Sequence, residues 1–119
     1  MRGSVGRYNP IMPVTPKVTE TTIVRACIEV IRHFGGYAER VNAGTAHRGQ
    51  YTIKLADEGC ADILGVWHGR ALAVEVKVPG KNPRKNQLEW KVKWEEAGGR
   101  YLCVHSPKEL RNELLGTKE

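Results

Sequence analysis

Apolar residues recur at helical spacing in the first third of the chain. Ile23, Cys27 and Ile31 follow a period of about 3.6 residues, which predicts an amphipathic helix. Thr15 is the predicted N-cap and Pro16 the first helical residue, because proline is favoured at that position. The glycine pair at positions 35 and 36 ends the helix.

Strand-like runs dominate the middle of the chain. Residues 37–42 predict a short strand, residues 43–50 (AGTAHRGQ) a loop of small residues, and residues 51–55 a further extended piece. The runs CADILGVW and ALAVEVKV alternate apolar and polar positions and are separated by His68 and Gly69. They predict a β-hairpin.

The second half of the chain is predicted to contain two helices and one strand. Asn82 and Pro83 predict the cap and first residue of a helix that runs through Ala97. Residues 100–105 (RYLCVH) predict a strand, and residues 106–109 (SPKE) form a capping box for a last helix toward Leu115. The order is helix, three strands, helix, strand, helix, which predicts an α/β fold.

Length and composition confine these elements to one domain. A chain of 119 residues can form one core but not two, so we expect a flexible arm over residues 1–15 and a single domain over 16–119. No apolar run approaches the roughly 18 residues that span a bilayer. We therefore expect a cytoplasmic protein without a membrane partner.

Charge and cysteine content narrow the class of partner. Lys and Arg outnumber Asp and Glu by 19 to 13, and the resulting net charge of +6 favours a polyanionic partner. Cys27, Cys60 and Cys103 are odd in number and lack CxxC spacing, which argues against both a disulfide framework and a zinc cluster. We expect them to be buried free thiols.

The predicted hairpin brings two carboxylates together. If Trp67 pairs with Arg70 across a two-residue turn, Asp62 lies opposite Glu75, with Cβ atoms about 4.5–5.5 Å apart. Two facing carboxylates repel each other unless they hold a cation, and oxygen ligands suit Mg²⁺ or Mn²⁺. The alternation of a strand places Lys77 on the same face as Glu75.

This acidic cluster with a lysine has the chemistry for phosphodiester hydrolysis. A cation there could activate water and neutralise phosphate charge, and a lysine ammonium could orient that water and stabilise developing charge. Glu20 and Gln87 lie on otherwise apolar helix stripes and could close over the cluster. The alternative for each residue alone is structural: a helix-terminal acid, a polar group filling a gap, or a solvated strand face.

Basic residues lie in two segments near this cluster. The loop PGKNPRKNQ lacks the spaced glycines of a phosphate-cradling loop, yet it is rich in cations. The candidates for contacts to a nucleic-acid backbone are Lys81, Arg84 and Lys85, together with Arg40 and Arg48. A solvated basic loop without a partner is the alternative.

Taken in order, these residues resemble the signature of a known nuclease family. Glu20, Asp62 within GCADILG, the run Glu75-Val76-Lys77 and Gln87 are similar to the virus-type replication-repair nuclease (VRR-NUC) branch of the PD-(D/E)xK superfamily. The resemblance covers about residues 19–104. It implies a restriction-endonuclease-like αβββαβ core with a mixed central sheet flanked by helices. Ala61 replaces the proline that gives the superfamily its name.

The resemblance also implies roles for these residues. Asp62 and Glu75 would ligate Mg²⁺ or Mn²⁺ with the backbone carbonyl of Val76. Lys77 would be the catalytic lysine, Glu20 an additional acid that acts on metal or water, and Gln87 a residue that positions the site.

The expected function is a divalent-metal-dependent DNA endonuclease. The short chain looks like the stand-alone phage members of the branch, which implies a homodimer that acts on branched DNA in the manner of a Holliday-junction resolvase. A non-catalytic basic nucleic-acid-binding module with the same fold is the alternative. The residues themselves also leave open an RNA-directed or non-nucleolytic phosphodiesterase.

Overall fold

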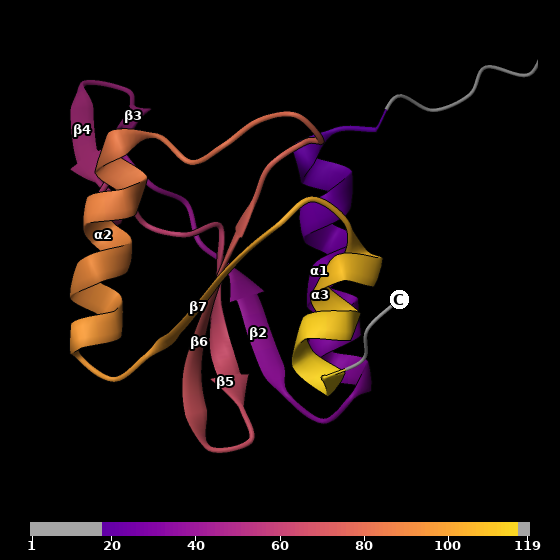
Figure 1. The fold of residues 1–119 in the computed structure, drawn as a ribbon. Helices are drawn as coiled ribbons and strands as arrows, with labels where there is room; N and C mark the ends of the chain where they lie inside the picture. Colours follow the sequence, from indigo (N-terminus) through magenta and orange to yellow (C-terminus); the bar gives the residue numbers. More distant parts are fainter. Residues whose placement is uncertain (1–17, 117–119) are drawn as a thin grey trace, which may run out of the picture.

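The computed structural model describes residues 18–116, so the predicted arm over residues 1–15 lies outside the described residues. The colours of Figure 1 follow the elements along the chain. In chain order they are α1 (Glu20–His33), β2 (Tyr37–Arg40), β3 (Thr45–Arg48), β4 (Tyr51–Lys54), β5 (Ile63–Trp67), β6 (Arg70–Val76), α2 (Lys85–Glu96), β7 (Arg100–Val104) and α3 (Pro107–Leu115). None of these helices is long and apolar enough to cross a membrane.

A mixed four-stranded sheet forms the centre of the fold, in the order β2-β5-β6-β7. The β2–β5 and β5–β6 pairs are antiparallel, and the β6–β7 pair is parallel because α2 carries the chain across between them. Helices α1 and α3 cover one face of the sheet, and α2 packs on the other face beside β7 (Figure 1). The predicted α/β fold with a mixed sheet flanked by helices is confirmed.

The predicted β5–β6 hairpin has the expected register. Trp67 pairs with Arg70 around a turn in which His68 and Gly69 both have positive φ, as a type I′ turn requires. Alternation along β6 then buries Leu72 and Val74 in the main core under α1 and turns Glu75 to the opposite face. The register that places Glu75 is therefore determined by the hairpin turn.

Helix α1 buries the predicted apolar stripe but begins later than predicted. Ile23, Cys27 and Ile31 are all buried in the main core. The N-cap is Thr19, whose hydroxyl accepts from the backbone N–H of Thr22, so the prediction of a cap at Thr15 is wrong. Residues 15 and 16 lie outside the described part of the chain. A hydroxyl residue directly before the acidic first turn at residue 20 satisfies the free N–H groups better than a cap one turn earlier.

Helix α2 also begins later than the sequence predicted. Its N-cap is Arg84, not Asn82, and its first helical residue is Lys85, not Pro83. The Gln87 side chain reaches back, and its Oε1 accepts a hydrogen bond of 2.8 Å from the Arg84 backbone N–H. This bond from the backbone N–H of the N-cap residue helps to fix the start of the helix at Arg84, without an asparagine cap.

Residues 43–50 are not the predicted loop. Thr45–Arg48 pair with Tyr51–Lys54 as the antiparallel hairpin β3–β4, with Gly49 in the left-handed conformation at its turn. This hairpin is inserted between β2 and β5 and forms a sheet of its own (Figure 1). The extended piece predicted over residues 51–55 is confirmed as β4, whereas β3 was missed because its sequence TAHR lacks the apolar alternation of a half-buried strand.

The cysteines are free thiols, as predicted. Cys27 and Cys60 are buried, and Cys103 is partly buried. Burial raises the pKa of the Cys27 thiol to about 12, so this group is neutral at physiological pH. The cysteines therefore act as small apolar residues.

Candidate active site

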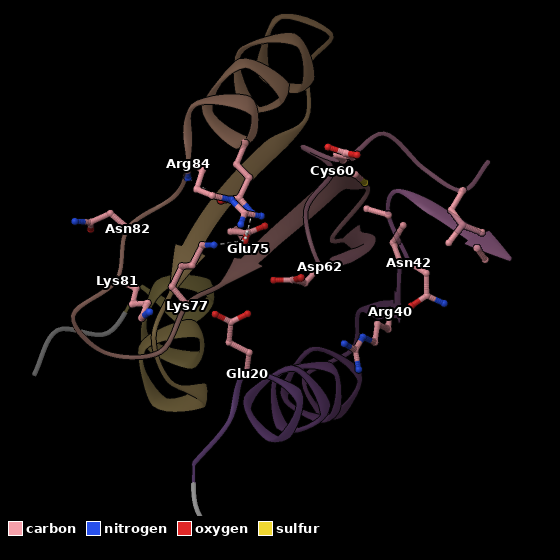
Figure 2. A pocket seen from close by; sticks show the side chains of 16 residues that line it. Glu20, Arg40, Asn42, Cys60, Asp62, Glu75, Lys77, Lys81, Asn82 and Arg84 are labelled. Carbon is pink, nitrogen blue, oxygen red and sulfur yellow. Dashed lines mark hydrogen bonds and ion pairs between the residues drawn. The ribbon is translucent and has the colours of Figure 1, made fainter. Parts of the chain in front are cut away.

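All five predicted catalytic residues line one pocket of about 810 Å³ (Figure 2). They come from the start of α1, the residue before β5, the end of β6 and the first turn of α2. In chain order they are Glu20, Asp62, Glu75, Lys77 and Gln87. Residues far apart in the sequence thus meet in one place.

Asp62 and Glu75 form the acidic centre. The β5–β6 register, continued by one residue beyond the Ile63–Val74 pair, brings Asp62 opposite Glu75. Oδ2 of Asp62 accepts a hydrogen bond of 2.9 Å from the backbone N–H of Val76, which holds the carboxylate against the end of β6. This bond ties the two acidic strands together at the pocket.

Both carboxyl groups are held above their ordinary pKa. Glu75 is 1 % exposed, and its burial and then the charge of Asp62 raise its pKa to about 7. Burial also raises the pKa of Asp62, against the hydrogen bond from Val76, and the charge of Glu20 raises it further. The site therefore carries unfavourable negative charge that a cation would relieve.

Lys77 and Gln87 both engage one oxygen of Glu75. Nζ of Lys77 lies 3.5 Å from Oε2 of Glu75, and Nε2 of Gln87 donates to the same oxygen over 2.9 Å. Because Oε1 of Gln87 accepts from Arg84, the amide is held at both ends. The Glu75 carboxylate is therefore fixed in one orientation.

The second oxygen of Glu75 fits a metal ion. Within the described residues Oε1 of Glu75 is buried without a hydrogen-bond partner, which is costly for a carboxylate. The described chain gathers no group of three His, Cys, Asp or Glu side chains that could hold a metal by itself. A divalent cation here would be held by one or two carboxylates and would take its other ligands from water or phosphate.

Glu20 approaches the centre from the opposite side. Its carboxylate points from the first turn of α1 into the pocket, toward Lys77 and Asp62 (Figure 2). Its negative charge raises the pKa of both Asp62 and Glu75. Glu20 therefore adds a further carboxylate to the pocket.

Three of the five predicted phosphate-contacting residues line the same pocket. Arg40, Lys81 and Arg84 are exposed and surround the acidic centre (Figure 2). Lys85 is exposed on the first turn of α2 and does not line the pocket. Arg48 pairs with Tyr51 at the end of the β3–β4 hairpin. Positively charged side chains therefore surround the acidic residues of the pocket.

Sequence reasoning missed several residues that line the pocket. Glu58 and Asn42 were not singled out, Cys60 was considered only as a buried thiol, and Asn82 only as a cap. All four lie in connections between elements, where no period indicates which side chain points inward. The only signal was the position of Glu58 and Cys60 just before Asp62.

The connection that precedes Asp62 packs closely against the backbone of α2. A Cβ on Gly59 would lie 2.2 Å from the backbone oxygen of Asn86 in α2, which no side chain can tolerate. Glycine at this position lets residues 57–60 pack directly against the start of the helix. The connection to Asp62 and the helix that carries Gln87 are therefore in contact.

Comparison with known proteins identifies the fold. No family model matches the chain, and no curated protein matches it. A solved structure described as a VRR_NUC domain is similar, with a TM-score of 0.59 and 20% sequence identity over 84% of this chain and 97% of the other. The chain has the fold of that VRR_NUC domain. Because folds host more than one function, the activity must be argued from the site.

Proposed function

We propose that this VRR_NUC-like protein is a nuclease that hydrolyses phosphodiester bonds in DNA with Mg²⁺ or Mn²⁺. The proposal rests on the contacts of the two carboxylate oxygens of Glu75. Its Oε2 is held by Lys77 and Gln87, while its Oε1 is buried beside Asp62 without a partner. A buried carboxylate oxygen without a partner destabilises the fold and gives no benefit to a module that only binds nucleic acid. In a metal-dependent hydrolase the same oxygen can bind the metal ion.

The two carboxylates and a backbone carbonyl would hold the cation. Asp62 and Glu75 supply the charged oxygens, and the Val76 carbonyl is the further ligand that the family resemblance implies. When bound, a divalent cation supplies Lewis acidity and positive charge where water meets the phosphodiester. Gln87 keeps Glu75 oriented for this task, and Glu20 accepts a proton or hydrogen bond from water in the pocket.

Lys77 supplies the positive charge that the protein itself contributes to the reaction. Its side chain is only 10% exposed and is held at Glu75. An ammonium group in a poorly hydrated pocket stabilises charge that develops on phosphate oxygens, and it can orient the attacking water. Arg40, Lys81 and Arg84 at the rim bind the flanking phosphates.

The proposed activity is tested with purified protein on a panel of linear duplex, flap and four-way DNA. We expect cleavage with Mg²⁺ or Mn²⁺ and none with EDTA, because the carboxylates act through the cation. Single-stranded and duplex RNA of matched sequence test the choice of nucleic acid. Binding to DNA without cleavage of any substrate would instead support the non-catalytic nucleic-acid-binding module.

We further propose that the protein acts as a homodimer on branched DNA. One chain offers a single acidic centre among its described residues, whereas a four-way junction must be cut on two strands at symmetric points. Light scattering is expected to show a dimer, and junction cleavage to give paired nicks in opposite strands. A monomer that cleaves linear and four-way DNA equally would contradict this proposal and leave a nuclease without preference for structure.

A further inference from the structure

The β3–β4 hairpin stands apart from the rest of the fold. Its strands pair only with each other, and among the described residues neither strand packs against another helix or strand. Its base is tied by two backbone hydrogen bonds of 2.8 Å, from Gly44 N–H to Ala56 O and from Leu55 N–H to Gly44 O. A hairpin that joins no core is only marginally stable by itself. Among the described residues, the hairpin is therefore held to the fold mainly at its base.

The base of the hairpin is one wall of the catalytic pocket. Ala43, Ala46 and Leu55 line this pocket together with Asp62 and Glu75. Lys81 and Arg84 lie on the other side of the acidic centre, in the connection that leads to α2 (Figure 2). The hairpin thus projects from the mouth of the site, opposite a basic rim.

Tyr51 is placed on the side of the hairpin that faces the pocket. Ala46 pairs with Ile53 and Arg48 pairs with Tyr51, so the alternation of the ribbon puts Tyr51 on the same face as Ala46. The Tyr51 side chain is 67% exposed, the largest fraction among the exposed large apolar side chains of the described chain. The phenol ring is therefore exposed to solvent, on the hairpin face whose base borders the pocket.

Resting on the proposed nuclease function, we propose that Tyr51 stacks on an unpaired base of the DNA substrate and that the β3–β4 hairpin thereby selects DNA in which a strand leaves the duplex. Arg40, Lys81 and Arg84 make the mouth complementary in charge to a nucleic acid. Aromatic side chains bind bases by stacking, which tolerates any sequence. Within a duplex both faces of a base are covered by its neighbours, so only an unpaired base presents a free face to the ring.

The test measures binding of the full-length protein to a flap, a splayed fork and a linear duplex without divalent metal. Each branched DNA carries 2-aminopurine at the first unpaired position, so that stacking on a ring quenches its fluorescence. Tyr51→Ala is expected to weaken binding to the branched DNAs about 5- to 100-fold, abolish the quenching and leave duplex binding unchanged. Tyr51→Trp is expected to retain both affinity and quenching.

Tyr37→Ala is the matched control, because Tyr37 is an exposed tyrosine of β2 in the central sheet and not of the β3–β4 hairpin. It should bind every DNA as the wild type does. Equal affinities of Tyr51→Ala and wild type for branched DNA, or equal losses on branched and duplex DNA, would overturn the proposal. If Tyr51→Ala converted a dimer to a monomer, the hairpin would be a contact between two copies of the chain, and the proposal would be wrong. Binding is measured without metal and does not require cleavage. If the wild type cleaved no DNA, the proposed nuclease activity would be wrong, and the role of Tyr51 would still be decided by the binding data.

Discussion

Replacing Lys77 by methionine is expected to lower the rate of DNA cleavage by about 10²- to 10⁴-fold, with little change in DNA affinity. Methionine preserves most of the side-chain volume of lysine but removes the ammonium group 3.5 Å from Glu75. That charge acts on developing phosphate charge and on water inside the pocket, while the exposed rim provides most of the binding. Single-turnover cleavage at saturating DNA and Mn²⁺ measures the effect.

Lys81→Met is the matched control for this variant. Lys81 lines the same pocket but is exposed, so its charge contributes to phosphate binding in solvent. We expect Lys81→Met to raise the dissociation constant a few-fold and to reduce its salt dependence, with the single-turnover rate unchanged. If Lys77→Met changed affinity and not rate, the lysine would be a phosphate contact, and its catalytic role would be wrong.

Glu75→Gln is expected to abolish Mn²⁺ binding while preserving the fold. Glutamine can still accept the hydrogen bond from Gln87, but it lacks the charge that a divalent ion requires. Asp62→Asn should act in the same way, because its amide oxygen can still accept from Val76 N–H. Calorimetric titration with Mn²⁺ measures the loss, with Glu58→Gln as a control that changes an exposed acid of the same pocket. Unchanged affinity in both variants would refute the ligand assignment.

The same substitution is expected to change how stability depends on pH. Glu75 has an ordinary pKa of 4.5 that burial raises to about 7, so the folded protein binds more protons than the unfolded chain between these values. Glu75 by itself therefore makes the free energy of unfolding in EDTA fall as pH rises from about 4.5 through 7. In Glu75→Gln this decrease should be absent, making the variant more stable than wild type at pH 8 by roughly 2–3 kcal/mol.

Urea denaturation at pH 5 and pH 8 measures this difference, and Mn²⁺ provides an independent check. At pH 8 the ion should stabilise the wild type by about 2.7 kcal/mol when its concentration is 100 times the dissociation constant. It should not stabilise Glu75→Gln. If the stability difference between wild type and Glu75→Gln in EDTA were the same at pH 5 and pH 8, the pKa of Glu75 would not be raised by its surroundings.

Short-range patterns in the sequence were sufficient for the framework of the fold. The stripe Ile23, Cys27 and Ile31 identified α1 because burial of one helix face imposes a 3.6-residue period. The two-residue turn at His68 and Gly69 determined the β5–β6 register, because a tight hairpin leaves only one pairing that matches the pleat. From that register the proximity of Asp62 and Glu75 followed.

Local patterns could not determine where polar elements begin or whether they form at all. Strand β3 was missed because its sequence TAHR holds a single small apolar residue and so shows no period, whereas the extended piece predicted at residues 51–55 forms β4. The starts of α1 and α2 were misplaced because several residues near each start could act as caps. The choice among them depends on which side chain actually meets the free N–H groups, as Thr19 and Gln87 do.

Spacing along the chain was enough to predict the strand pairing that brings Asp62 opposite Glu75 and the helix stripes that carry Glu20 and Gln87. The charge and hydration of the site could not be predicted in this way. The packing of α2 against β7 and of residues 57–60 against α2 removes water from Glu75 and brings Gln87 and Lys77 to one of its oxygens. Desolvation depends on every neighbour in three dimensions, so no local pattern encodes it.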